Sequence, residues 1–279
     1  MRASQVVIPV QTARQCEHAE ALHIRRQAEV CTQLYPEQEI VIRLGPRGGV
    51  TIRTLAIFEG KLNRAVGYGP DRALRADEVE EIESIFAPIG LGPQIHLSPF
   101  ALPSTLQTLF RRGYVERGIL STYWYPLERP TDAHVLAVET QKVASSETQR
   151  FIEASVAGFQ DNGRSHDLLR ALAEIATRRE DTALYFALVD GAIAGSAALA
   201  SIETPEGSVA HLYLDSTILA YRGRGVHRAL IHARLSDAHR RGLSLATMIT
   251  SMGDGSARNA ERAGMSLAYT IPIVSGPRP

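Results

Sequence analysis

Apolar residues recur along the chain at two spacings, and the two spacings alternate from segment to segment. Apolar positions three and four residues apart predict helices over residues 12–34, 75–90, 103–113, 145–159, 165–180, from about 226, and over 256–264. Continuous or alternating apolar runs predict strands over residues 39–44, 50–58, 62–69, 93–98, 118–127, 134–139, 183–190, 192–203, 208–218, 245–250 and 267–274. This order predicts an α/β fold, with a mixed twisted sheet flanked by helices.

A stretch rich in proline and charge, residues 126–134 (PLERPTDAH), separates two strand-like runs and marks a boundary. We therefore expect two domains, residues 1–128 and 134–279. The segments TLQTLFRRGYVERGILSTY and SARNAERAGMSLAYTIPIV both run from a short helix through Arg and Gly into a strand. This weak internal repeat predicts that the two domains are related.

The composition narrows the class of protein. With 44% hydrophobic and 22% charged residues among 279, the chain can build a full core as a globular protein. Lys plus Arg and Asp plus Glu number 30 each, which argues against a nucleic-acid or membrane partner and makes any anion site local. No apolar stretch approaches the length of a membrane span. The two cysteines, Cys16 and Cys31, form neither a disulfide framework nor a metal-ligand pattern, so we expect a cytoplasmic protein without a metal.

The segment YRGRGVHRALIHARL, residues 221–235, joins a strand to a helix. The strand ends near Thr217, and the helix starts near Val226 with an apolar stripe that includes Ala229, Leu230 and Ala233. A helix packed on a sheet through this stripe directs its unpaired first N–H groups at the preceding turn. The turn is therefore a candidate site for an anion.

Two glycines and two arginines fill this turn. Gly223 and Gly225 let the backbone bend so that successive amides converge, while Arg222 and Arg224 add charge, and together they favour a pyrophosphate cradle. The P-loop motif is absent, and Arg228 stands where a dinucleotide fingerprint needs its third glycine. An arginine-rich turn without a ligand is the structural alternative.

The residues RGRGVH, 222–227, resemble the [Q/R]-x-x-G-x-[G/A] acyl-CoA loop of the GNAT N-acetyltransferase superfamily, with His227 in place of the final small residue. The likeness covers the order of elements over residues 135–274. SARNAERAGM also resembles the segment that closes the acyl-CoA cleft, with Met265 where phenylalanine more often stands. The resemblance implies an α/β domain that splays two central strands and holds acetyl-CoA, the acyl donor, in the gap.

The resemblance also assigns the contacts to the donor. Backbone amides near Thr217 and Leu219 would run beside the pantetheine arm, and Asn259 would add a polar contact to that arm; a buried or capping asparagine is the alternative. The pyrophosphate would be held by the amides of Arg222, Gly223, Arg224, Gly225, Val226 and His227. The side chain of His227 would either crowd the phosphates or donate to them.

Candidate catalytic residues lie on the strand before the loop. Alternation predicts that His211, Tyr213 and Asp215 share one face of this strand. His211 lies eleven residues before Arg222, a distance at which some family members place a general base, and a histidine satisfied by its neighbours is the alternative. Tyr213 is the alternative proton carrier, and Asp215 could orient either one. The family's usual acid, a tyrosine, falls at Ala260 and is missing.

The N-terminal half resembles a degenerate copy of the same fold. Its loop and helix start, PDRALRADEVEEI, lacks paired glycines and carries acidic residues that would repel a pyrophosphate, namely Asp77, Glu78, Glu80 and Glu81. We expect this half to be a structural partner that forms one side of the acceptor cleft.

The resemblance therefore implies an N-acetyltransferase that transfers an acetyl group from acetyl-CoA to a small-molecule or protein amine by direct attack. A non-catalytic acyl-CoA-binding regulatory protein and a module that binds another diphosphate are the alternatives. A homodimer is one possible oligomeric state. The fold does not determine which amine is the acceptor.

Overall fold

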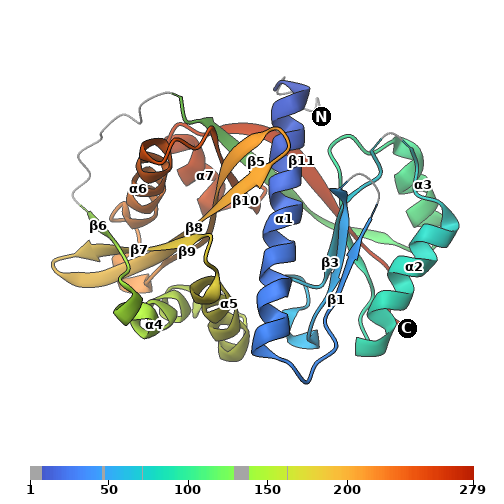
Figure 1. Cartoon of the computed structure of the whole chain (residues 1–279), viewed down its shortest axis with the longest axis horizontal. Helices are drawn as coiled ribbons and strands as arrows, with labels where there is room; N and C mark the ends of the chain where they lie inside the picture. Colours follow the sequence, from blue (N-terminus) through green and yellow to red (C-terminus); the bar gives the residue numbers. More distant parts are fainter. Residues whose placement is uncertain (1–7, 46–47, 71, 129–137, 162) are drawn as a thin grey trace. The chain divides into compact units, whose positions relative to one another are not determined.

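The computed structural model describes residues 8–45, 48–70, 72–128, 138–161 and 163–279 (Figure 1). Contacts divide the chain into two compact units: Met1–Ser121 with Tyr269–Pro279, and Thr122–Ala268. The strands β5 (Val115–Pro126) and β11 (Ser266–Ser275) run from one unit into the other. The predicted domains were 1–128 and 134–279; by contacts, residues 122–128 group with the second unit, and Tyr269–Pro279 at the end of the chain group with the first. Most of the predicted strand 134–139 lies outside the described residues.

The first unit packs helices on a small sheet. Its helices are α1 (Val10–Leu34), α2 (Ala76–Phe86) and α3 (Pro103–Arg111), and its strands are β1 (Val41–Leu44), β2 (Val50–Arg53), β3 (Arg64–Tyr68) and β4 (Gln94–Leu97). The order in its sheet is β1-β2-β3-β4-β11, with β3 and β4 parallel and the other pairs antiparallel. Ile82 and Phe86 of α2 pack with Ile95 of β4 in the core.

Residues 54–58 do not continue the predicted strand 50–58. After β2, Ala56–Phe58 form a 3₁₀ turn, and the side chain of Phe58 is fully buried. The side-chain oxygen of Asn63 accepts a hydrogen bond from the backbone N–H of Thr54 at 2.6 Å. Apolar alternation predicted a strand, but this side-chain contact with the backbone replaces the strand ladder.

The second unit holds the segment that resembles an acyl-CoA loop. Its helices are α4 (Thr148–Phe159), α5 (His166–Arg178), α6 (Val226–Arg240) and α7 (Gly255–Arg262), and its strands are β6 (Glu139–Lys142), β7 (Thr182–Val189), β8 (Ala192–Thr204), β9 (Gly207–Thr217) and β10 (Leu245–Ser251). The strand order is β5-β10-β9-β8-β7-β6, with β9 and β10 parallel and β6 to β9 antiparallel. Figure 1 shows α6 on one face of this sheet and α4 and α5 on the other. The predicted α/β class with a mixed sheet is confirmed.

The two units repeat one local topology. In each, a strand leads through a helix to a parallel neighbour, as β3–α2–β4 in the first and β9–α6–β10 in the second. The first strand of each motif has an irregular register beside a residue with positive φ, Gly67 at 75° and Leu214 at 55°. These two motifs precede the segments α3–β5 and α7–β11, in which the sequence shows the weak repeat.

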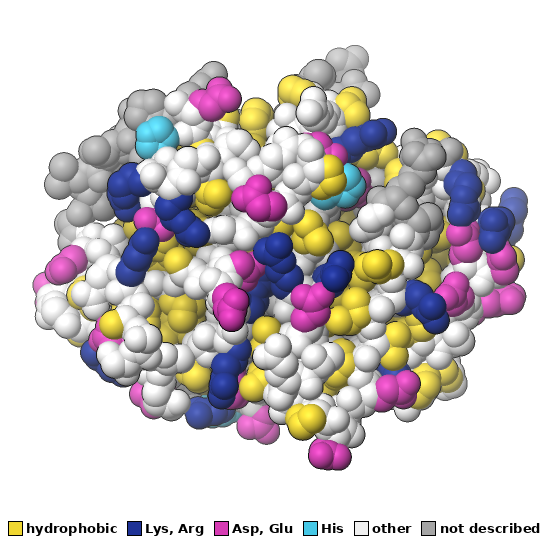
Figure 2. Space-filling model, viewed as in Figure 1, with side chains coloured by type: hydrophobic (Ala, Val, Ile, Leu, Met, Phe, Trp, Pro, Cys, Tyr) yellow, Lys and Arg dark blue, Asp and Glu magenta, His cyan; other side chains and the backbone are white. Residues whose placement is uncertain are grey.

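Basic and acidic side chains are interspersed on the face of the molecule that Figure 2 shows. The ion pairs among the described residues include that of Arg112 with Glu83 at 2.7 Å. None of the described helices is long and apolar enough to cross a membrane.

Candidate functional site

The turn before α6 adopts the backbone that its glycines permit. Gly223 and Gly225 have φ of 78° and 82°, a region that side chains disfavour, and Gly225 directly precedes the first residue of α6. Val226 and Leu230 are buried in the core of the second unit, which fixes the direction of the helix. The first N–H groups of α6 therefore point out of the core at the turn.

A cavity of about 1010 Å³ opens at this helix start. Several predicted site residues line it, namely Thr217, Arg222, Gly223, Arg224, Gly225, Val226, His227 and Asn259. Leu219 does not line it and is 64% exposed. The sequence analysis did not single out Gly158, Arg258 and Arg262, which also line the cavity. The loop, the end of β9 and α7 thus meet at one site.

The side chains of Arg222 and Arg224 line the cavity, and each is paired with a carboxylate. The Arg222 guanidinium pairs with Asp161 at 2.5 Å and donates to the Thr217 carbonyl at 3.3 Å, and Arg224 pairs with Asp190 at 3.1 Å. The hydrogen bond from Arg222 lowers the pKa of Asp161. These ion pairs connect the loop to its surroundings and offset the charge of the two arginines.

The end of α4 approaches β9 at the cavity more closely than a side chain would allow. A Cβ placed on Gly158 would lie 2.5 Å from the Ser216 hydroxyl and 3.0 Å from the Thr217 backbone nitrogen. Glycine is therefore required for this contact.

A β-bulge interrupts β9 beside the cavity. Tyr213 pairs with Ala198 of β8, whereas Ser216 pairs with Ser196, so two residues of β9 face one residue of β8. Leu214 sits in the bulge with φ of 55°. A bulge leaves an extra residue out of the ladder, which frees backbone groups at this point.

The bulge reverses which side chains share a face. Before it, Leu212 packs in the core on the α6 side, and within it Leu214 packs against the cluster on the α4 side. Asp215 therefore points toward α6, while His211 and Tyr213 lie on the opposite face. The prediction that Asp215 shares a face with these two residues was wrong, because strict alternation does not hold through a bulge.

His211 and Tyr213 lie together but do not line the cavity. The Nδ1 of His211 is 3.0 Å from the Thr247 hydroxyl, and the Tyr213 hydroxyl is 3.0 Å from that of Thr182. The two rings are 6.3 Å apart between centroids, and the Arg179 guanidinium lies 5.6 Å from the Tyr213 ring centroid. Burial raises the pKa of Tyr213, so its phenol stays protonated at neutral pH.

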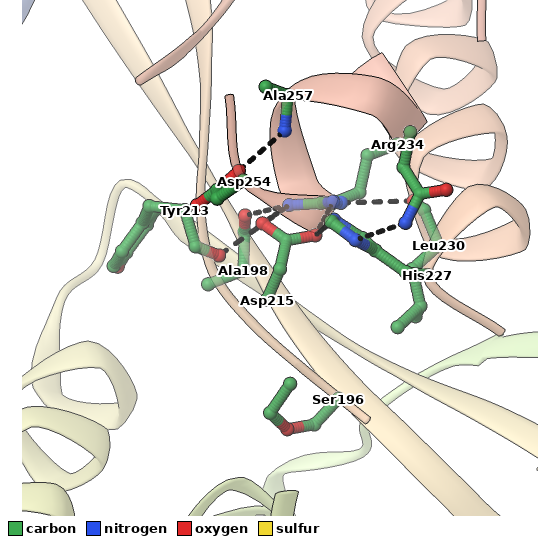
Figure 3. A network of polar contacts seen from close by, with 11 residues as sticks. Ser196, Ala198, Tyr213, Asp215, His227, Leu230, Arg234, Asp254 and Ala257 are labelled. Carbon is green, nitrogen blue, oxygen red and sulfur yellow. Dashed lines mark hydrogen bonds and ion pairs between the residues drawn. The ribbon is translucent and has the colours of Figure 1, made fainter. Parts of the chain in front are cut away.

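A buried arginine anchors Asp215 (Figure 3). Arg234 of α6 is fully buried, pairs with the Asp215 carboxylate, and donates to the carbonyls of Ala198 at 2.9 Å and Leu230 at 3.0 Å. Burial alone would raise the pKa of Asp215, but Arg234 and His227 outweigh it and lower that pKa. The sequence analysis missed Arg234, although a charged residue eight positions after Val226 falls on the apolar stripe of α6 and signals a buried pair.

His227 joins three elements at the floor of the cavity. Its Nε2 lies 3.2 Å from Asp215 Oδ1 on β9, and its Nδ1 lies 3.1 Å from the side-chain nitrogen of Asn259 on α7. The cap of α7 is Asp254, which accepts from the Ala257 N–H at 2.7 Å, so Asn259 is not a capping residue. Figure 3 shows His227 directed toward Asp215. The imidazole is therefore held against β9 and α7.

The strands β9 and β10 separate beside this network. Their pairing runs from Val209 opposite Leu245 to Leu212 opposite Met248 and ends there, although β9 continues to Thr217. The bulge and the end of pairing coincide, which opens the sheet next to the cavity.

Comparison with known proteins shows which solved structures have a similar fold. No protein-family model matches the chain, and no curated protein matches its sequence. A GCN5-related N-acetyltransferase from Kribbella flavida is 20% identical, with 93% of this chain and 96% of that chain covered and a TM-score of 0.66. One from Sphaerobacter thermophilus is 18% identical, with 72% and 65% covered and a TM-score of 0.53. The chain has the fold of GCN5-related N-acetyltransferases.

A functionally unknown conserved protein from Staphylococcus epidermidis has a similar fold. It is 11% identical, with 89% of this chain and 97% of that chain covered and a TM-score of 0.61. At such identities a GCN5-related fold carries no activity with it, so activity is argued from the site.

Two further positions bear on the site predicted from the sequence. Ala260, where the usual tyrosine would stand, is fully buried. Tyr221, in the turn before the loop, is a tyrosine that does line the cavity. Among the residues that the structure describes, no His, Cys, Asp or Glu cluster could hold a metal ion.

The equivalent helix start in the first unit is closed by acids. The Glu78 carboxylate accepts a hydrogen bond from the Arg75 backbone N–H at 2.9 Å, and it also pairs with Arg72 at 2.5 Å. Asp77 pairs with Arg75 at 2.8 Å. A carboxylate of the chain itself thus occupies the start of α2, where α6 opens onto a cavity.

Proposed function

We propose that this chain is an acyl-CoA-dependent N-acetyltransferase whose second unit binds acetyl-CoA and transfers the acetyl group to an amine. The observation that carries the proposal is the cavity at the start of α6, with Gly223 and Gly225 in the left-handed region and the first amides of the helix directed at the turn. Such a start binds phosphate groups through backbone N–H donors and the helix dipole. A volume of about 1010 Å³ suits a ligand as large as CoA.

The donor would lie along the end of β9. With its pyrophosphate at the loop, the pantetheine arm would pass Thr217 and reach the gap where β9 and β10 separate. The bulge at Leu214 lies at that gap and has backbone groups outside the ladder. A free N–H there would polarise the thioester carbonyl, which lowers the barrier to attack.

Acetyl transfer requires that the amine lose a proton and that the CoA thiolate gain one. The amine nitrogen attacks the carbonyl carbon, the carbon–sulfur bond breaks, and the thiolate takes a proton. We assign His211 as the general base that removes the proton from the amine, directly or through a water. Burial keeps the phenol of Tyr213 protonated at neutral pH, so Tyr213 carries a proton that it would give to the thiolate, and it is not a base in this state.

Thiol release over a panel of amines tests this proposal. Purified protein with acetyl-CoA should release CoA when a suitable small-molecule or peptide amine is added, as measured with a thiol reagent. Calorimetry with acetyl-CoA, CoA and ATP gives the ligand class independently of turnover. Binding of ATP without binding of either CoA compound would contradict the proposal and favour a module for another diphosphate.

A non-catalytic acyl-CoA-binding regulatory protein is the second candidate. Ala260 provides no hydroxyl at the usual acid position, and neither His211 nor Tyr213 lines the cavity. Tight acetyl-CoA binding with no CoA release across the whole amine panel would favour this candidate.

A further inference from the structure

The cavity at the start of α6 carries several positive side chains. The arginines that line it are Arg222, Arg224, Arg228, Arg258 and Arg262. The carboxylate of Asp215 also lines it, but Arg234 and His227 already pair with that carboxylate. The lining therefore carries more positive charge than the amides of a pyrophosphate cradle alone would supply.

These arginines fall into two groups by their partners. Arg222 and Arg224 are paired with the exposed acids Asp161 and Asp190, so their charge is offset nearby. The other three have no ion pair within the described parts of the chain.

The second group consists of Arg228, Arg258 and Arg262. Arg258 donates to a neutral acceptor, the Gly253 carbonyl, at 3.0 Å. The neighbouring carboxylate of Asp254 already accepts the Ala257 N–H at the start of α7. Positive charge without a carboxylate partner is thus concentrated where α7 borders the cavity.

One contact between α6 and α7 brings these three arginines to the same side of the cavity. Asn259 of α7 lies 3.1 Å from His227 of α6, and Arg258 and Arg228 are the chain neighbours of these two residues. Arg262 follows Arg258 by four residues, so both arise from one face of α7. The three side chains therefore flank the cavity from two helices.

We infer that Arg228, Arg258 and Arg262 bind the 3′-phosphate of CoA. The inference rests on the proposed acyl-CoA function. CoA carries a phosphomonoester on its ribose in addition to the pyrophosphate, and such a group holds between one and two negative charges at neutral pH. The amides at the helix start account for the pyrophosphate, while guanidinium groups bind a phosphomonoester through paired, charge-assisted hydrogen bonds.

Calorimetry with CoA and 3′-dephospho-CoA tests the inference without any turnover. The wild-type protein should bind CoA about tenfold or more tightly than 3′-dephospho-CoA. In the variant Arg228→Ala/Arg258→Ala/Arg262→Ala, CoA affinity should fall until the ratio of the two affinities approaches one. Arg170→Ala, an exposed arginine of α5 outside the cavity lining, should keep the wild-type ratio.

Two results would overturn the inference. One is a wild-type protein that binds both compounds within about twofold, and the other is a triple variant that loses affinity for both by the same factor. A wild-type protein that binds neither compound would contradict the proposed function itself, and the inference with it. Thermal melting of each variant establishes that it folds, and the single variant Arg262→Ala, at an exposed helix position, should reduce the ratio by a smaller factor.

Discussion

The imidazole of His227 lies 3.2 Å from the carboxylate of Asp215, measured between Nε2 and Oδ1. Asp215 in turn pairs with Arg234, so one carboxylate lies between two basic groups at the floor of the cavity. The resemblance to an acyl-CoA loop left two roles for His227, to crowd the phosphates or to donate to them. Its contacts with Asp215 and Asn259 indicate a third role, to join the first turn of α6 to β9 and α7.

Asp215→Asn should destabilise the protein at neutral pH by about 3 kcal/mol, because it leaves the buried Arg234 without its counterion. The pKa of Asp215 is lowered in the folded state, so its contribution is complete above the unfolded value of about 3.9 and is lost as pH falls through the folded value. Urea unfolding at a series of pH values should therefore show wild type and variant converging only below about pH 4.

Asp161→Asn provides the matched control, because Asp161 forms an exposed pair with Arg222. This substitution should lower the free energy of unfolding by less than about 1 kcal/mol. An Asp215→Asn variant as stable as this control at pH 7 would show that the pair with Arg234 does not hold the fold of the site.

His211→Ala should lower turnover about 10²–10⁴-fold with the amine identified by the panel, because the general base is lost. Affinity for acetyl-CoA should stay close to wild type, because His211 does not line the cavity. Thr247→Val removes the hydroxyl 3.0 Å from the imidazole and should cause a smaller loss. Unchanged turnover and an unchanged pH profile in His211→Ala would make the histidine structural and pass its role to Tyr213 or a water.

Acetyl-CoA should bind with a stoichiometry of one per chain. The start of α2 is closed by Glu78, whose carboxylate would repel a pyrophosphate. Calorimetry or equilibrium dialysis gives this number directly. Two equivalent sites per chain would refute the view that the first unit is a degenerate copy.

The loop and α6 could be predicted from the sequence because their signals are local. Gly223 and Gly225 mark the turn, and the apolar stripe from Val226 marks the buried face of the helix. The acidic start of α2 was visible in the same way. The order of strands and helices then sufficed for the fold class.

The floor of the cavity could not be predicted, because it depends on a bulge without a sequence signal. Leu214 is a residue type that seldom takes a positive φ, and nothing in the sequence marks it as the place where alternation fails. The wrong face for Asp215 follows from it, whereas Arg234 had a signal in its place on the apolar stripe of α6. Arg258 and Arg262 were missed for another reason, since a short polar helix presents several charges and only the tertiary contacts show which side borders a cavity.

Calorimetric titration of acetyl-CoA into wild type, Gly225→Val and Gly242→Val tests the central claim most directly. Gly225 and Gly242 both have positive φ, 82° and 71°, at opposite ends of α6, so valine should strain the backbone at either position. Gly225→Val should abolish binding by displacing the turn, whereas Gly242→Val should bind as wild type does, because Gly242 does not line the cavity. A folded Gly225→Val protein with wild-type affinity for acetyl-CoA would contradict the assignment of this loop as the acyl-CoA site.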